Sequence, residues 1–160
     1  MAEVLPPDTT ALAKKELVYL GSFGIAAWLS GIIFVDRANH TSAINTMKHV
    51  AEIMKEKKAN IWIFPEGTRS MKGTLLPFKK GAFHLAVGAQ IPIVPVIFSN
   101  YKSFFDHEDP TFEKGEIVAT CLEAISTKGL TSDDVDSLIQ QIREKMLRVF
   151  HKNDDPNKIN

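Results

Sequence analysis

Short apolar runs alternate with segments of helical periodicity along this chain, and this alternation restricts the possible folds more than any other feature. The runs expected to form strands are residues 31–37, 60–64, 93–99 and 115–125. The segments expected to form helices run from Thr41 or Ser42 to about Lys58, over 79–89, and onward from Thr131 and Ser132. Strands separated by helices are typical of an α/β fold with right-handed crossovers. The sequence therefore predicts a mostly parallel central sheet flanked by helices.

The stretch 17–35 carries no charge, and its length reaches the lower end of a membrane-spanning helix, roughly 17–25 residues. Gly21, Gly24, Ser30 and Gly31 interrupt it. We prefer a hydrophobic helix of about 12 residues that leads into a buried strand. Periodicity leaves three alternatives open, because a core helix, a helix that dips into a membrane face and a true span would look alike.

The composition is that of one ordinary globular domain. Of the 160 residues, 44% are hydrophobic and 24% charged, which predicts a single domain over 1–152 and a disordered tail over 153–160. The 19 basic and 19 acidic side chains cancel, which argues against a nucleic-acid partner. Cys121 is the only cysteine, so an internal disulfide and a cysteine-based metal site are excluded. We expect its thiol to be buried.

Polar clusters follow three of the expected strands: Asp36 with Arg37, residues 65–69, and Ser99 with Asn100. If the strands are parallel, these clusters meet at the edge of the sheet where ligands gather in α/β folds. A glycine at position 67 lets the backbone approach a ligand closely. Thr68 and Arg69 offer donors that suit a phosphate.

Further positive charge at this edge favours a phosphate site, since Arg37, Lys79 and Lys80 would add to that of Arg69. The alternative is an ordinary turn with a surface Glu66–Arg69 pair worth under about 1 kcal/mol. A Walker pattern and a GxGxxG pattern are both missing from the sequence, so this is not a nucleotide-binding loop of either type.

Four segments resemble the signature blocks of the 1-acylglycerol-3-phosphate acyltransferases in order and spacing: GIIFVDR (31–37), FPEGTRS (64–70), LPFKKGAF (76–83) and IPIVPVIFS (91–99). LPPDTTALAKKELVYLG and GLTSDDVDSL extend the resemblance over nearly the whole chain. The resemblance implies that the substrate phosphate is held by Glu66, Gly67, Thr68, Arg69 and Lys14. It places Arg37 in another substrate-binding block. The block around Pro95 is associated with acyl-donor binding or with structure.

The reaction that the resemblance implies moves a fatty acyl group from acyl-coenzyme A to the sn-2 hydroxyl of lysophosphatidic acid, which gives phosphatidic acid for phospholipid biosynthesis. Acyl-coenzyme A is then a co-substrate, and neither a bound cofactor nor a metal is expected. The resemblance also implies a membrane-associated protein of the endoplasmic reticulum. Another acceptor, such as glycerol 3-phosphate or a lysophospholipid, stays open, as do acyl-chain preference and oligomeric state.

One block of the family is not found in these 160 residues. Its Asn-His-x4-Asp pattern supplies the general base and the carboxylate that orients it, and it should stand before EVLP (3–6). We interpret NHTSAIN (39–45) as a helix-start turn, because Asn45 cannot stabilise a His40 imidazolium as a carboxylate does.

A missing base costs about 10²–10⁴ in rate. We therefore expect an N-terminally truncated fragment that is inactive alone. The alternative is a non-catalytic product that binds lipid phosphate or regulates the full-length enzyme.

Overall fold

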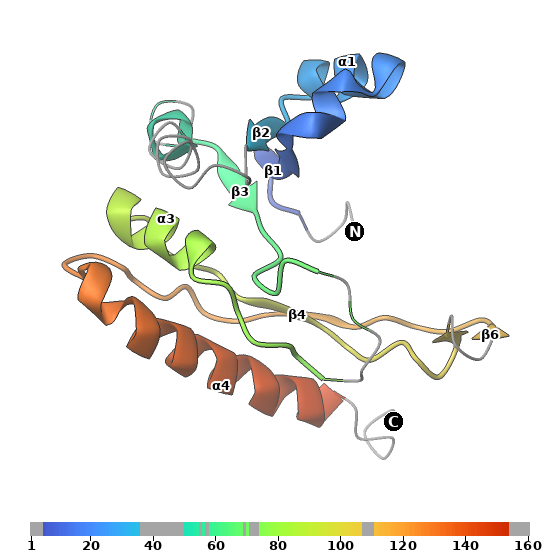
Figure 1. The fold of residues 1–160 in the computed structure, drawn as a ribbon. Coiled ribbons are helices and arrows are strands. Elements are labelled where there is room, and N and C mark those ends of the chain that lie inside the picture. The colour runs from blue at the N-terminus through green and yellow to red at the C-terminus, as the bar shows by residue number, and fades with distance from the viewer. Residues whose placement is uncertain are drawn as a thin grey trace. The chain divides into compact units, whose positions relative to one another are not determined.

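The computed structural model describes residues 5–35, 50–54, 56, 58–68, 70, 74–106 and 111–153. The chain divides into two compact units, Met1–Phe64 and Pro65–Asn160 (Figure 1). Each unit has its own elements, and each is described separately. The prediction of a single domain over 1–152 stays a prediction.

The first unit is built on a parallel sheet of three strands in the order β2-β1-β3. These strands are β1 (Thr9–Lys14), β2 (Ile33–Val35) and β3 (Asn60–Trp62). The register pairs Leu12 with Ile33 and Thr9 with Asn60. Strands at 31–37 and 60–64 were expected, and both occur with shorter bounds. The central strand β1 was not expected.

The connection from β1 to β2 is helical, as a parallel pair requires a crossover. It consists of the 3₁₀ helix η2 (Lys15–Tyr19) and the helix α1 (Gly21–Leu29). Gly21 has a φ of +52°, which ends one helix and starts the next. Gly24 lies against the end of η2, where an added β-carbon would meet the Val18 carbonyl oxygen. A hydrophobic helix leading into a strand is therefore present, but α1 has nine residues rather than the expected 12 or so, a break at Gly21 separates it from η2, and the strand is half-buried rather than buried.

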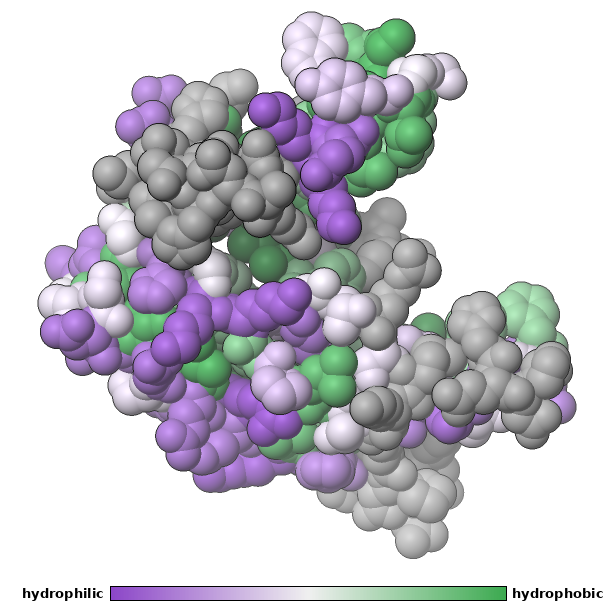
Figure 2. All heavy atoms as spheres, viewed as in Figure 1, coloured by the Kyte–Doolittle hydropathy of each residue, from purple (hydrophilic) through white to green (hydrophobic). Residues whose placement is uncertain are grey.

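From Val18 onward the surface of η2 and α1 is largely apolar, and Figure 2 shows green side chains gathered there. Only Gly24 and Ala27 of α1 are buried. The exposed large hydrophobic side chains of this segment are Val18, Tyr19, Leu20, Phe23, Ile25, Trp28 and Leu29. Within its unit α1 is therefore not a core helix, and Ile33 and Phe34 of β2 are only half-buried. In the described part of the chain, every helix is too short or too polar to cross a membrane.

The helix predicted to run to about Lys58 is only partly covered by the structure. Residues 50–54 and 56 are helical, and Lys58 lies beyond the helix with a φ of +50°. Val50 is fully buried. The start of this helix, including Thr41 and Ser42, lies outside the described residues.

The described residues of the second unit form two α-helices and two antiparallel strand pairs. It contains α3 (Gly81–Ala89), β4 (Val96–Phe98), β5 (Phe105–Asp106), β6 (Thr111–Phe112), β7 (Ala119–Cys121), the 3₁₀ helix η3 (Ser132–Asp134) and α4 (Val135–Asn153). β4 pairs with β7, and β5 pairs with β6. The helix at 79–89 and the strands within 93–99 and 115–125 were expected, whereas the β5–β6 hairpin was not.

The core of the second unit forms where α4 packs against α3 and β4. In the sequence of the last helix, the apolar residues at helical spacing are Val135, Leu138, Ile142, Met146 and Val149. The structure buries the first four and Phe150, and Val149 is partly buried. Apolar residues at this helical spacing form one stripe, which explains why the core side of α4 could be read from sequence.

The last helix starts where it was expected, at Thr131 and Ser132, and this start is a capping box. The Thr131 hydroxyl accepts from the Asp133 amide at 3.4 Å, and the Asp134 carboxylate accepts from the Thr131 amide at 2.8 Å. The Thr131 hydroxyl also donates to the Asp134 carboxylate at 2.9 Å. The hydrogen bonds that Asp134 accepts from the Thr131 backbone, which contributes most, and from the Thr131 hydroxyl hold the pKa of its carboxyl below the ordinary value. At the other end, α4 includes Asn153, and 154–160 lie outside the described residues.

Pro95 interrupts the strand that contains it, because proline has no N–H to donate to the strand pairing. Ile93 bridges Ile125, and Val96 pairs with Cys121. The step from Cys121 to Ile125 is one residue longer than the step from Ile93 to Val96, so an extra residue is accommodated opposite Pro95. This is the irregularity expected of a β-bulge.

The prediction of a buried thiol at Cys121 is wrong, because the side chain is exposed. Side chains alternate between the two faces of a strand. In the β4–β7 pair, Ile97 and Thr120 lie opposite each other, and Ile97 joins the core with α4. Cys121 is next to Thr120 in sequence and therefore points to the other face.

Candidate functional site

The 65–68 turn, which contains Glu66 and Gly67, is held in place by two hydrogen bonds from residues further along the chain. The Lys79 amide donates to the Pro65 carbonyl at 2.8 Å. The Leu76 amide donates to Oε2 of Glu66 at 2.8 Å, and this contact is partly buried. The turn is thus tied to the segment 76–79 at both its backbone and its acidic side chain.

At Gly67 the backbone of the turn lies directly against the Lys79 side chain. Its φ is +67°, a conformation that costs an L-residue roughly 1–2 kcal/mol. An added β-carbon would lie 2.8 Å from Cδ and 2.9 Å from Nζ of Lys79, closer than side chains approach one another. The missing side chain therefore leaves room for the Lys79 ammonium against the glycine backbone.

The exposed surface of the turn suits an anion. Gly67, Thr68 and Lys79 are all exposed to solvent. A lysine ammonium supplies full positive charge, and a glycine without a β-carbon permits close approach of a ligand to the peptide groups. Arg69, the other cation predicted here, lies outside the described residues.

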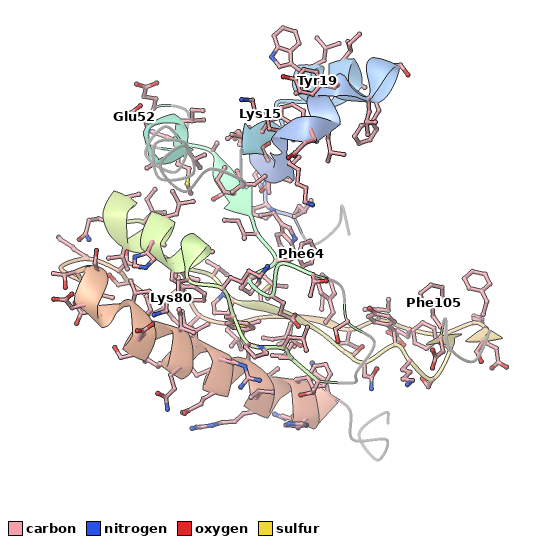
Figure 3. All side chains as sticks on the ribbon, in the orientation of Figure 1. Lys15, Tyr19, Glu52, Phe64, Lys80 and Phe105 are labelled. Carbon is pink, nitrogen blue, oxygen red and sulfur yellow. The ribbon has the colours of Figure 1, made fainter. Side chains whose placement is uncertain are left out.

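The two adjacent lysines point to different partners. The Lys79 side chain lies against Gly67. Lys80 instead pairs with Asp136, with its Nζ 2.7 Å from Oδ1 and 2.8 Å from Oδ2 (Figure 3). This ion pair is largely exposed, so it contributes little to stability. Within the second unit, only Lys79 of the pair is brought to the turn.

The remaining predicted residues lie in the first unit, elsewhere in the second unit or outside the described residues. Lys14 is exposed at the carboxyl end of β1, opposite Val35 in the first unit. Arg37 and His40 lie outside the described residues. Pro95 is buried in the second unit, where its carbonyl accepts from the Leu122 amide at 2.9 Å. The meeting of the three polar clusters at one sheet edge stays a prediction.

A further residue of this site, Arg143 of α4, was not found from sequence. Its Nη2 donates to the Leu75 carbonyl at 2.7 Å and its Nε to the Leu76 carbonyl at 3.2 Å. Leu75 and Leu76 share the peptide group whose N–H, on Leu76, donates to the Glu66 carboxylate. Arg143 is far from the turn along the chain and belongs to no motif, so only the packing of α4 reveals the contact.

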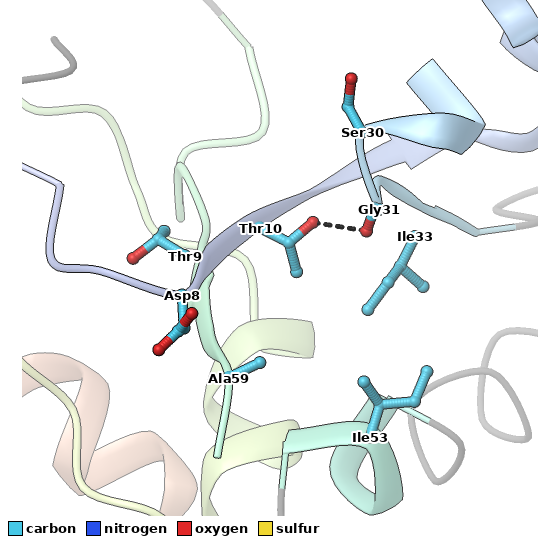
Figure 4. A pocket seen from close by; sticks show the side chains of 8 residues that line it. All are labelled: Asp8, Thr9, Thr10, Ser30, Gly31, Ile33, Ile53 and Ala59. Atoms are coloured by element: carbon cyan, nitrogen blue, oxygen red, sulfur yellow. Dashed lines mark hydrogen bonds between the residues drawn. The ribbon is translucent and has the colours of Figure 1, made fainter. Parts of the chain in front are cut away.

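The first unit contains a pocket lined by Asp8, Thr9, Thr10, Ser30, Gly31, Ile33, Ile53 and Ala59 (Figure 4). The Thr10 hydroxyl donates to the Gly31 carbonyl across it at 2.7 Å. Asp8, Ile33 and Ala59 stand at the beginnings of the three strands. The pocket therefore opens at the amino edge of the sheet, opposite to the edge where α/β folds bind their ligands. Across the described ranges, acidic, histidine and cysteine side chains form no metal-binding group.

Comparison with known proteins identifies the family to which these motifs and this fold belong. A model of the acyltransferase family matches residues 1–99. The chain is 45% identical over 152 residues to human 1-acyl-sn-glycerol-3-phosphate acyltransferase alpha, which covers 95% of this chain and 54% of the relative. It is 40% identical over 149 residues to the 1-acyl-sn-glycerol-3-phosphate acyltransferase of Saccharomyces cerevisiae, covering 92% of this chain and 49% of that protein.

A solved structure has the same fold. It is the 1-acyl-sn-glycerophosphate (LPA) acyltransferase PlsC of Thermotoga maritima, with a TM-score of 0.66 and 26% identity over 91% of this chain and 56% of that chain. The α/β prediction is confirmed by this likeness and by the parallel sheet of the first unit. The chain spans about half the length of the relatives it matches. The matched motifs, the family model and the shared fold agree, and the chain belongs to the acyltransferase family.

Proposed function

We propose that the 65–68 turn and Lys79 bind the phosphate of lysophosphatidic acid, within an enzyme that acylates the sn-2 hydroxyl of this lipid from acyl-coenzyme A and yields phosphatidic acid. The observation that carries the proposal is the Lys79 ammonium placed against the open backbone of Gly67. The similarity to proteins named for this reaction supports the choice of lipid.

The parts of the turn have separate roles in this proposal. Lys79 neutralises phosphate charge, Gly67 allows the oxygens to approach the backbone, and the Thr68 hydroxyl is a further polar group beside them. Arg69, Lys14 and Arg37 are proposed phosphate or substrate contacts from the family resemblance alone. Pro95 has a buried ring and a carbonyl bonded to Leu122, which supports a structural role for its block.

The chemistry proposed for the full reaction needs a general base on the acceptor hydroxyl. The Asn-His-x4-Asp block that supplies it in the family is not within these 160 residues. We propose that this chain by itself binds lysophosphatidic acid without turning it over, and that acyl-coenzyme A is a co-substrate rather than a resident cofactor.

We also propose that the protein acts at a membrane surface, at the endoplasmic reticulum. The support is the apolar surface of η2 and α1, where Tyr19, Phe23 and Trp28 are largely exposed. Aromatic side chains of this kind partition into the interface between water and lipid.

Calorimetric titration of the purified chain with lysophosphatidic acid in neutral detergent micelles tests the binding. We expect saturable binding of lysophosphatidic acid and much weaker binding of monoacylglycerol, which has the same acyl chain without the phosphate. Lys79→Ala should weaken lysophosphatidic acid binding roughly tenfold, the loss expected for one charge-assisted contact.

The neighbouring substitution Lys80→Ala provides the contrast, because Lys80 pairs with Asp136. It should weaken binding by a much smaller factor. Equal binding of the two lipids, or equal effects of the two lysine variants, would count against the proposed site. An assay with acyl-coenzyme A should show no turnover by the isolated chain. Turnover that is lost in His40→Ala would instead show that His40 replaces the missing base.

A further inference from the structure

We propose that Arg143 is a positioning residue for the 65–68 turn, and that it acts through the single peptide group that joins Leu75 to Leu76. The position of that turn is set by this contact with α4. What the turn binds is the part of the inference that rests on the proposed function.

The peptide group between Leu75 and Leu76 is held on both of its polar sides. Its carbonyl oxygen accepts from Nη2 of Arg143 at 2.7 Å. Its N–H donates to Oε2 of Glu66 at 2.8 Å. In a trans peptide the C=O and the N–H point in opposite directions. The guanidinium and the carboxylate therefore grip one planar group from opposite sides.

The charges of the two side chains act in the same sense. A cation at the carbonyl and an anion at the N–H both polarise the peptide along its own dipole, so each hydrogen bond strengthens the other. Arg143 is half-buried and both contacts are partly buried, which limits competition from water. The arrangement links Arg143 to Glu66 although the two side chains do not meet.

The link continues from Glu66 to the proposed anion site. Glu66 directly precedes Gly67, and the adjacent Pro65 carbonyl accepts from the Lys79 amide at 2.8 Å. These contacts fix where Gly67 stands relative to the Lys79 side chain. Glu66 is therefore a residue that shapes the turn, and its negative charge is directed at a backbone N–H rather than at a phosphate.

An arginine is required for the complete contact. Arg143 reaches two successive carbonyls, since its Nε lies 3.2 Å from the Leu76 oxygen in addition to the Leu75 contact. The planar guanidinium presents donors in a fixed fork, whereas a lysine ammonium is a single point. Ile142, the preceding residue of α4, is 1% exposed, so the backbone that carries Arg143 is anchored in the core.

The test compares Arg143→Met, Arg143→Lys and the control Arg148→Met on the exposed side of the same helix. The first readout is the amide resonances of Gly67 and Thr68 together with hydrogen exchange at the Leu76 amide. The second is affinity for lysophosphatidic acid in detergent micelles. We expect Arg143→Met to shift these resonances, to speed Leu76 exchange at least tenfold and to weaken binding about tenfold. Arg143→Lys should fall between Arg143→Met and the wild type, and Arg148→Met should match the wild type.

A double-mutant cycle separates this role from general stability. If the peptide group transmits the effect, Arg143→Met should change Leu76 exchange much less in a Glu66→Ala background than in the wild type. Additive effects, or unshifted Gly67 and Thr68 resonances in Arg143→Met, would overturn the positioning role. If the wild type binds lysophosphatidic acid, an unchanged affinity in Arg143→Met would also overturn the positioning role. A wild-type chain that binds no lysophosphatidic acid would refute the proposed function, while the resonances and the cycle still decide the role of Arg143.

Discussion

At the scale of single residues, Gly67 determines how the turn and Lys79 meet. Its positive φ shapes the turn. Its missing β-carbon leaves room for the Lys79 side chain. The structure contains a glycine that separates these effects. Gly129 has a φ of +81° and nothing within 4 Å of an added β-carbon.

Gly67→Ala should weaken lysophosphatidic acid binding about tenfold or more, because the new methyl group displaces the flexible Lys79 side chain. Gly129→Ala should bring a similar backbone strain, roughly 1–2 kcal/mol in urea unfolding, without a change in binding. Titration calorimetry and unfolding curves of both variants check this. Loss of affinity in both, or in neither, would show that the contact with Lys79 is irrelevant to the site.

At the scale of elements, α4 connects the core to the turn. One side of it carries the apolar stripe that packs on α3 and β4, and Arg143 beside that stripe reaches the 75–76 peptide group. The capping box at Thr131 sets where the helix begins. A change at the start of α4 therefore affects an element on which the turn depends.

The pKa of Asp134, lowered by the hydrogen bonds from Thr131, predicts a loss of stability in acid. A carboxyl with a lowered folded-state pKa contributes stability above its ordinary pKa, and this is lost as the pH falls through the folded value. Asp134→Asn should therefore flatten the acid limb of a plot of unfolding free energy against pH. Asp133→Asn is the matched control, because its side chain is outside the capping box. Equal flattening in both would assign the effect to helix charge in general.

At the scale of the whole molecule, the chain joins two compact units of different surface character. The first exposes a run of large apolar side chains from Val18 to Leu29, whereas the described exposed large apolar side chains of the second are the separate Val94, Phe112, Ile117 and Val118. Net charge cancels over the chain, so long-range attraction to lipid does not follow from charge alone. The apolar surface of the first unit is the feature that supports membrane binding.

Replacing Phe23 and Trp28 by serine should lower partitioning of the chain into phosphatidylcholine vesicles. Each large side chain contributes roughly 1.5–3 kcal/mol when buried, so each loss should cost about tenfold or more. Vesicle sedimentation measures the partition coefficient. Phe112→Ser is the control, since Phe112 is 88% exposed in the second unit. An equal loss in the control would mean that exposed aromatic surface acts without regard to position.

Much of the fold could be predicted because local sequence patterns determine where several strands and helices form. Apolar runs located β2, β3 and β4, and the helical stripe with its Thr131 cap located α4. Strand β1 was missed because its Ala- and Lys-containing segment has no strong strand preference of its own. It is a strand because β2 and β3 pair with it on both sides.

The sequence by itself determined the α/β class, the family motifs and the glycine turn beside two lysines, because these depend on neighbouring residues. Only the tertiary structure decided which lysine meets Gly67, that Cys121 is exposed, and that Arg143 holds the peptide group facing Glu66. Such contacts join residues far apart in the chain and arise from the direction in which packed elements point their side chains. Local propensity carries no information about that direction.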